Sequence, residues 1–522
     1  MRTRPPLFAL VLLLATLGPA TVRAQILPPN PKISPALLTR MASNALALQP
    51  VIVEMEGAAP PFSGLVNVQR AQLALNLLTI YGQAVGGLPI VDAAAGWANA
   101  AGITAISLVP GVAYIHEDAT VSPRRTTASG PAWPPGQLTS LYPREVKANL
   151  VWPQSQGNGV TVAVLDSGIA ASPDLGNRVL TRVNFAGPKT TDDPGGHGSH
   201  VAGIVAGSGT LSQGEYVGIA PAAKLVDVRV IDENGGGRIS SVVAGIGWAL
   251  DHRQQYNIRV LNLSFGAPPL ASYRADPMTA ALEIAWKRGV AVVVAAGNSG
   301  PGSGTVHSPG YDPYGITVGA TDDLGTLSLA DDGLAWFSSW GTPAGGRPKP
   351  DVVAPGRKIV SLRVPGSTLD TLLADHVTPA ANGASMFRLT GSSQATGVVS
   401  GTVALMLART PSLTPDQVKA ILVGTTQGYG PGGSPVLPDP TADGSGLLNA
   451  QAAYQSAARP SVNGGLRPSD AFARTVYPAL YGQPLSWLDP NYLGIAWNTL
   501  TWDNIAWDNI AWDNIAWDNI AW

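Results

Sequence analysis

The sequence predicts an α/β protein built on a mostly parallel sheet with helices on both faces. Between about residue 140 and residue 455, apolar runs of strand length alternate with helical patterns of small residues. The strand candidates are apolar throughout, as expected for strands that are buried on both faces. Polar residues able to carry chemistry stand where these runs end, and open parallel sheets place their sites at those ends.

The same pattern predicts individual elements. The expected strands are Val160–Leu165, Lys224–Val230, Val260–Leu263 and Val290–Ala295. The expected helices are Val201–Gly207, Ser240–Asp251, Thr279–Arg288 and Thr396–Leu407. A helix between successive strands supplies the crossover that a parallel pair needs.

A smaller α+β unit is expected at residues 25–125. An alternating strand at Val51–Glu54 precedes a helical pattern at Val68–Tyr81, and a second strand–helix pair follows. The unit closes with Val112–Glu117, and the polar, proline-rich stretch 122–136 has the composition of a linker.

Residues 1–24 have the layout of a secretory signal peptide. Arg2 and Arg4 precede the apolar run Leu7–Leu17, and Val22-Arg23-Ala24 offers a small-x-small cleavage site. The run is too short to cross a bilayer as a stable helix, and a retained anchor is the alternative. We therefore expect a secreted protein with no membrane span in its mature form.

Composition excludes several classes of function. Charged residues make up 13% of the chain and the net charge is −2, so no basic surface is available for nucleic acid. The chain has no cysteine, which excludes disulfides, thiolate zinc sites and cysteine nucleophiles.

The chain ends in a repeat at residues 497–522, where tryptophan recurs every five positions in the unit WDNIA. This period places the rings on no common helix face and on alternate faces of a strand. Three interpretations remain open. The tail could be a surface module whose rings stack on cell-wall sugars or on other tails, a low-complexity tail that is ordered only when bound, or a pentapeptide β-helix.

Asp166 and His197 are the first two candidates for chemistry. Asp166 ends an apolar strand, where a carboxylate needs a partner, although an N-cap role is the alternative. His197 lies in a glycine-rich loop–helix junction that lets other segments approach its ring. His200 raises the alternative of a metal pair, but no third ligand or HExxH pattern accompanies it.

Ser393 and Asn298 complete the set of candidates. Ser393 precedes a helix of small residues, where backbone N–H groups and the helix dipole favour a developing oxyanion, with a simple N-cap as the alternative. Asn298 follows an apolar strand, where its amide can donate a hydrogen bond or simply form a turn. An α/β-hydrolase site is excluded, because all six histidines precede Ser393.

Asp166, His197, Asn298 and Ser393 follow one another along the chain, each beside glycine. In the segments VAVLDSGI, HGSHVAGI, NLSFG, VVAAGNSG, KPDVVAPG and LTGSSQATG, the sequence resembles the subtilisin-like serine proteases, or subtilases (peptidase S8). The resemblance covers about residues 145–455, and six motifs in the family's order make it specific. Residues 50–118 resemble more loosely that family's inhibitory propeptide.

The resemblance implies a role for each candidate. Ser393 is the expected nucleophile, His197 the general base and then acid, and Asp166 the group that orients the imidazole. Asn298 and the Ser393 N–H form the expected oxyanion hole. The residues expected to bind substrate are Gly235, Gly236, Gly237, Ser264, Phe265, Gly266, Ala295, Ala296 and Gly297. Because these residues are small and uncharged, we expect the substrate side chain just before the cut bond to be apolar.

The sequence also departs from the family pattern. Ser392, Gln394, Gly397 and Val398 stand where the family usually has Thr, Met, Pro and His. These changes suggest reduced activity with an intact triad, while Ser385-Met386 imitates the usual Ser-Met pair without a following helix. No cofactor is expected for the chemistry and no metal is assigned, although Asp322, Asp323, Asp331 and Asp332 are conceivable ligands of a structural calcium ion.

These observations predict a secreted serine endopeptidase with a subtilisin-like fold, made as a self-processed zymogen. Its expected partners are polypeptide substrates and its own propeptide. The alternative function is a catalytically weak scaffold whose tail acts in surface attachment or self-association. The expected segments are a signal peptide (1–24), a propeptide (25–125), a linker containing or near the processing site (126–144), a catalytic domain (145–455), a second linker (456–496) and the tail (497–522).

Overall fold

The computed structural model describes residues 30–56, 64–122, 140–187, 192–269, 272–342, 346–466, 468–470 and 472. The expected signal peptide and the tryptophan-rich tail lie outside these residues, as do most of the two expected linkers. What the sequence predicts for those segments stays a prediction. Within the described ranges, no helix is both long and apolar enough to cross a bilayer.

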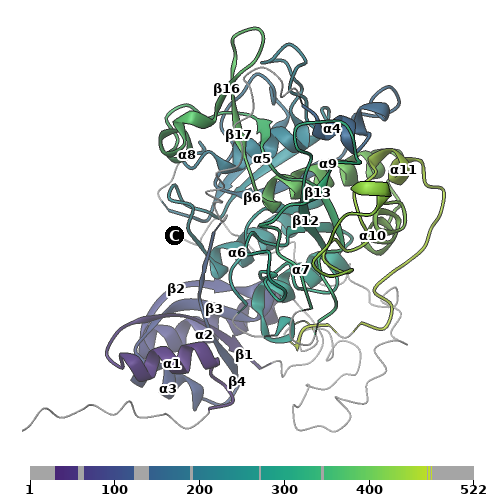
Figure 1. Ribbon diagram of the computed structural model, residues 1–522. Coiled ribbons are helices and arrows are strands. Elements are labelled where there is room, and N and C mark those ends of the chain that lie inside the picture. Colours follow the sequence, from purple (N-terminus) through teal and green to yellow (C-terminus); the bar gives the residue numbers. More distant parts are fainter. Residues whose placement is uncertain are drawn as a thin grey trace, which may run out of the picture.

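A central sheet of eight strands dominates the larger part of the molecule (Figure 1). The strand order is β13–β12–β11–β10–β6–β8–β7, and β14 pairs with β12. Every pairing is parallel except that of β13 with β12, which confirms the predicted fold class. The strands are β6 (Thr161–Asp166), β7 (Val179–Asn184), β8 (Lys224–Arg229), β10 (Ile258–Leu263), β11 (Ala291–Ala295), β12 (Ile316–Asp322), β13 (Gly333–Leu334) and β14 (Val352–Pro355).

Helices cover both faces of this sheet. Helices α5 (His197–Ala206) and α9 (Ser392–Arg409) pack together on one face, and α6 (Ile239–Asp251) and α7 (Pro277–Lys287) pack together on the other (Figure 1). Helix α9 begins four residues before the predicted start, so Ser393 lies in its first turn. The remaining helices of this part are α4 (Tyr142–Glu145), α8 (Thr368–Leu372), α10 (Pro415–Gly424) and α11 (Ala450–Gln455).

A small antiparallel sheet lies beside the central one, in the order β15 (Ile359–Ser361), β17 (Ser385–Leu389), β16 (Val377–Pro379). Ser385 and Met386 lie in β17, so this pair does not open a helix as a subtilase nucleophile would.

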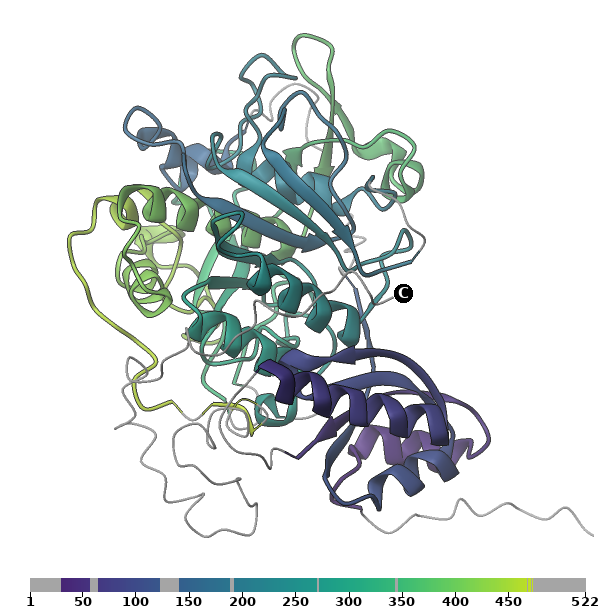
Figure 2. The same ribbon diagram turned by 180° about the vertical axis from the view of Figure 1, so that it is seen from behind.

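The N-terminal unit is a four-stranded antiparallel sheet with helices on one face (Figure 2). Its strands, in the order β2–β3–β1–β4, are β1 (Gln49–Met55), β2 (Gln83–Leu88), β3 (Ala93–Ala98) and β4 (Val112–Glu117). The helices are α1 (Pro35–Ser43), α2 (Gly64–Tyr81) and α3 (Ala100–Ser107).

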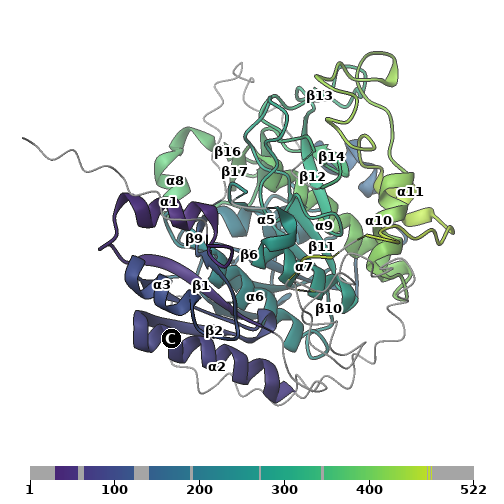
Figure 3. The same cartoon turned by 90° about the horizontal axis from the view of Figure 1, so that it is seen from below.

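This N-terminal sheet is buried on both faces. Val51 and Val53 of β1 pack under the unit's own helices. Ile52 between them joins the large central core instead, together with Leu88 and Ala95. Because successive side chains of a strand point to opposite faces, the second face of the sheet lies against the larger part, next to α6 and α7 (Figure 3).

Candidate active site

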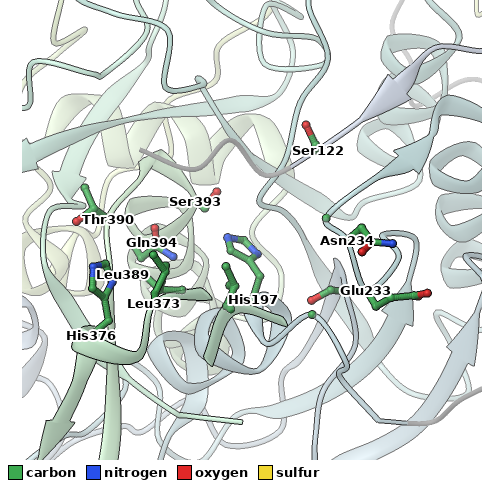
Figure 4. A pocket seen from close by; sticks show the side chains of 14 residues that line it. Ser122, His197, Glu233, Asn234, Leu373, His376, Leu389, Thr390, Ser393 and Gln394 are labelled. Carbon is green, nitrogen blue, oxygen red and sulfur yellow. The ribbon is translucent and has the colours of Figure 1, made fainter. Parts of the chain in front are cut away.

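A cavity of about 260 Å³ opens beside the N-termini of α5 and α9 (Figure 4). His197 and Ser393 both face this cavity. The residues that line it are Ser122, Ser167, Gly195, His197, Glu233, Asn234, Gly235, Leu369, Leu373, His376, Leu389, Thr390, Ser393 and Gln394.

Asp166 and His197 form a buried pair at the end of β6. The Nδ1 atom of His197 lies 2.8 Å from Oδ1 of Asp166, which also accepts a hydrogen bond from the Ser167 N–H at 2.8 Å. Asp166 is 1% exposed and His197 is 8% exposed. An Asp166 carboxylate in this position fixes the imidazole with its proton on Nδ1, which leaves Nε2 as the basic atom.

A second buried carboxylate, Asp193, holds the loop that carries His197. Asp193 accepts hydrogen bonds from the Gly196 N–H at 2.7 Å, the Ser199 N–H at 2.8 Å and the Ser167 hydroxyl at 2.7 Å. Burial raises the pKa of the Asp193 carboxyl, and these hydrogen bonds act in the opposite direction. Asp193 could not be singled out from the sequence, because its partners, two nearby backbone N–H groups and one serine hydroxyl, form no distinctive motif.

Ser393 is placed by the first turn of α9. Its hydroxyl donates to the Ser264 carbonyl at 2.8 Å, and the Ser264 hydroxyl donates to the Ser393 carbonyl at 3.1 Å. Asn262 and Ser400 extend this network, because the Asn262 amide donates to the Ser264 hydroxyl and accepts from Ser400, both at 2.8 Å. The segment after β10 is thus tied to the helix that carries Ser393.

Asn298 faces the same helix from the loop after β11. Its side-chain oxygen accepts a hydrogen bond from the Ser392 N–H at 2.8 Å. Its amide nitrogen lies against Gly391, where an added Cβ would stand only 2.9 Å away. The side-chain oxygen of Asn298 thereby binds the first turn of α9.

The departures from the family pattern are accommodated in this structure. The Ser392 hydroxyl accepts a hydrogen bond from the Gly297 N–H at 3.1 Å, so serine suffices at this position. A Cβ on Gly397 would lie 3.1 Å from Cγ2 of Ile204, so glycine allows α9 to approach α5 closely. Val398 is fully buried, and Gln394 is buried at the cavity wall.

The expected substrate-binding residues fall into three places. Gly237 and Gly266 flank the segment that leaves the N-terminal unit, on opposite sides of it. Gly235 lines the cavity. Ala295 ends β11, and Ala295, Ala296 and Gly297 are all buried. Gly297 has φ +111°, and a Cβ added there would lie 2.9 Å from Cγ of His307.

The alternative of a metal pair at His200 finds no support in the geometry of the described residues. The His200 ring is fully buried, and its Nε2 lies 3.0 Å from the Phe387 carbonyl and 3.2 Å from that of Ile359. Burial lowers the pKa of His200 to about 3, so this histidine is a neutral structural donor. Within the described residues, no group of three or more His, Asp or Glu side chains is arranged to hold a metal ion.

Three of the four aspartates considered for calcium, Asp322, Asp323 and Asp332, lie near the buried Glu145. Asp322 pairs with Arg357, and Asp331 accepts hydrogen bonds from the Thr326 hydroxyl. Asp332 contacts Glu145, which is 4% exposed. The pKa of Asp323 is raised to about 6 and that of Asp332 to about 7. Burial is the main cause of both shifts, and neighbouring carboxylates add to it. No calcium ligand set is assigned.

The mostly parallel sheet with helices on both faces is the subtilisin-like α/β fold. The profile of the Subtilase family (Peptidase_S8) matches residues 157–454, so the chain belongs to this family. Among its relatives, Serine protease AprX of Bacillus subtilis (strain 168) is 40% identical over 301 residues, which are 56% of this chain and 66% of that protein.

Two further relatives extend the similarity. M-protease of Shouchella clausii (strain KSM-K16) is 35% identical over 353 residues, 67% of this chain and 76% of that protein. Subtilisin Savinase of Lederbergia lenta is 36% identical over 299 residues, 57% of this chain and 91% of that protein. The match with AprX spans just under two thirds of the length of AprX.

Proposed function

We propose that this chain is a secreted serine endopeptidase, synthesised as a zymogen that cuts itself. Asp166, His197 and Ser393 form its catalytic triad, and residues 1–24 direct its export. Residues 25–125 act as an inhibitory propeptide. Its substrates are polypeptides, which bind in an extended conformation along the cleft.

Peptide hydrolysis proceeds by acyl transfer. His197 takes the proton of the Ser393 hydroxyl as the oxygen attacks the carbonyl carbon, while Asp166 stabilises the imidazolium. The Asn298 amide and the Ser393 N–H stabilise the oxyanion. His197 then protonates the leaving amine, and a water molecule activated by the same imidazole hydrolyses the acyl-enzyme.

One observation carries this proposal: the segment after the N-terminal unit lies in the cleft as an added strand. Strand β5 (Thr120–Val121) pairs antiparallel with β9 (Gly237–Arg238), and Ser122 pairs antiparallel with Gly266 on the other side. Ser122 lines the same cavity as His197 and Ser393 (Figure 4). Recognition by strand addition uses backbone hydrogen bonds and tolerates many side chains.

Contacts beside this strand support the role of the N-terminal unit as an inhibitor. The Asp118 carboxylate accepts hydrogen bonds from the N–H of Ser240 at 3.0 Å and from its hydroxyl at 2.7 Å, at the N-terminus of α6. The Arg238 guanidinium lies 4.6 Å from the centre of the Trp97 ring. A unit bound at several points beside a strand in the cleft keeps other polypeptides out.

Expression of the wild-type chain beside Ser393→Ala tests the proposal. We expect the wild type to lose about the first 125 residues and react with a fluorophosphonate probe, and the variant to do neither. Identical processing of both chains would show that another protease makes the cut. Absence of probe labelling in folded wild-type protein would contradict the catalytic assignment itself.

A further inference from the structure

We propose that His307 limits the size of the substrate side chain that precedes the cut bond, so that the enzyme prefers small residues there. This inference rests on the proposed function and specifies its substrates. It follows from three chain segments that meet beside Ser393, namely 264–266, 296–298 and 306–308. The space between the first two segments is called the slot below.

The first two segments flank the nucleophile. The Ser264 carbonyl accepts a hydrogen bond from the Ser393 hydroxyl at 2.8 Å, and the Asn298 side-chain oxygen accepts one from the Ser392 N–H at 2.8 Å. Gly266 pairs antiparallel with the strand that the N-terminal unit adds to the cleft. A substrate whose backbone pairs with 264–266, and whose reacting carbonyl points to the Asn298 amide, directs the side chain of that residue into the slot.

The third segment joins the other two. The His307 N–H donates to the Ala296 carbonyl at 2.9 Å. On the opposite side, the Ser308 N–H donates to the Ala267 carbonyl at 2.9 Å, and the Ala267 N–H donates to the Ser308 carbonyl at 3.0 Å. Backbone hydrogen bonds therefore hold His307 at the end of the slot.

The His307 ring fills the room that two glycines leave. A Cβ added to Gly266 would lie 2.7 Å from Cβ and 3.3 Å from Nδ1 of His307. A Cβ added to Gly297 would lie 2.9 Å from Cγ and 3.1 Å from Cδ2 of the same side chain. Because Nδ1 and Cδ2 lie on opposite edges of the imidazole, the ring lies between the two glycines.

A hydrogen bond holds the ring in this place. Nε2 of His307 lies 2.8 Å from the Ser299 hydroxyl, and the Ser299 N–H donates to the Ser339 hydroxyl at 2.9 Å. His307 is 5% exposed, so rotating the ring away would break this contact inside the protein. Of the described residues that line the cavity beside Ser393, none belongs to 264–266 or 296–298, as expected when the ring occupies the slot.

The filled slot selects substrates by size. Protein interiors are close-packed, so a large side chain could enter only by displacing the imidazole and its hydrogen bond. A glycine, alanine or serine residue before the cut bond needs no such displacement, whereas a phenylalanine ring needs the volume that His307 occupies. This preference is narrower than the general apolar preference expected from the sequence.

Two chromogenic peptides test the inference in the processed wild-type enzyme. They differ only in the residue before the cut bond, which is alanine in one and phenylalanine in the other. We expect kcat/KM for the alanine peptide to be higher by roughly tenfold or more. Equal values, or a preference for phenylalanine, would overturn the role of His307 and leave the proposed function intact. Folded enzyme that cuts neither peptide and does not react with a fluorophosphonate would refute the proposed function, and this inference with it.

His307→Gly supplies a second readout, because it empties the slot. We expect the ratio of the two kcat/KM values to move toward phenylalanine by roughly tenfold or more. Misfolding would lower both values together, so it would not produce this shift. His252→Gly makes the same change beyond the far end of α6 from Arg238 and should keep the wild-type ratio. An unchanged ratio in active His307→Gly would contradict the inference, and the wild-type comparison decides it if that variant does not fold.

Discussion

Replacing Ser392 by alanine removes one hydrogen bond beside the expected oxyanion hole. Ser392 is 1% exposed, and its hydroxyl accepts a hydrogen bond from the Gly297 N–H at 3.1 Å. Gly297 is buried, has φ +111° and directly precedes Asn298. Alanine leaves this N–H without an acceptor, so the loop that carries Asn298 loses one of its attachments to α9.

The size of the effect follows from the cost of a buried, unsatisfied donor. That cost is about 1–3 kcal/mol. If all of it falls on the transition state, kcat decreases by roughly 5- to 150-fold. If it falls on stability, Tm decreases by about 2–4 °C per kcal/mol for a domain of this size. The Ser392 N–H still binds Asn298, so we expect the loss to be shared between kcat and Tm, with little change in KM.

Steady-state cleavage of a chromogenic peptide and thermal unfolding measure the two parts. Ser392→Thr is the matched control, because threonine keeps the acceptor oxygen and is the family's usual residue. Counting active sites with a fluorophosphonate corrects for misfolded enzyme. Wild-type kcat and wild-type Tm in Ser392→Ala would refute the argument that this hydroxyl supports the loop.

Three further predictions concern packing, pH and the propeptide. Gly401→Ala should lower stability by about 1–3 kcal/mol in thermal unfolding, since the new Cβ would lie 2.6 Å from Cβ of Ile219, whereas Gly424→Ala meets no atom within 4 Å and should not. Carboxyls with raised pKa values favour the folded state most when protonated, so the Asp323 and Asp332 contributions should be lost as pH rises from about 4 to about 7. Glu145→Gln should flatten this part of a Tm–pH profile, and the exposed Asp375→Asn should leave it unchanged. Asp118→Ala should weaken the affinity of the cleaved propeptide for the catalytic domain by roughly tenfold or more, because Ser240 loses two hydrogen bonds to a carboxylate. Gel filtration should then separate the two parts, and co-elution equal to that of the wild type would contradict this prediction.

Several features of the fold could be predicted from local patterns. Strands β6, β8, β10 and β11 were expected within two residues of their observed bounds, because buried parallel strands are apolar throughout. The start of α9 was placed too late, since Ser392 and Ser393 are weak helix formers in isolation. Packing of the helix between α5 and the sheet outweighs that preference.

Local patterns likewise predicted some residues of the candidate site and missed others. Asp166, His197, Asn298 and Ser393 could be proposed because glycine-rich motifs surround each of them. Asp193, Asn262 and Ser400 could not, because they hold the site through hydrogen bonds that leave no pattern along the chain.

The sequence by itself determined the alternation of strands and helices, the family motifs and their order, since these depend on residue types at short spacing. Only the tertiary structure decided that the strand at Thr120–Ser122 lies between Gly237 and Gly266, and that Glu145 meets Asp332. These contacts join residues more than a hundred positions apart. Their geometry depends on how whole layers pack, which short-range patterns do not encode.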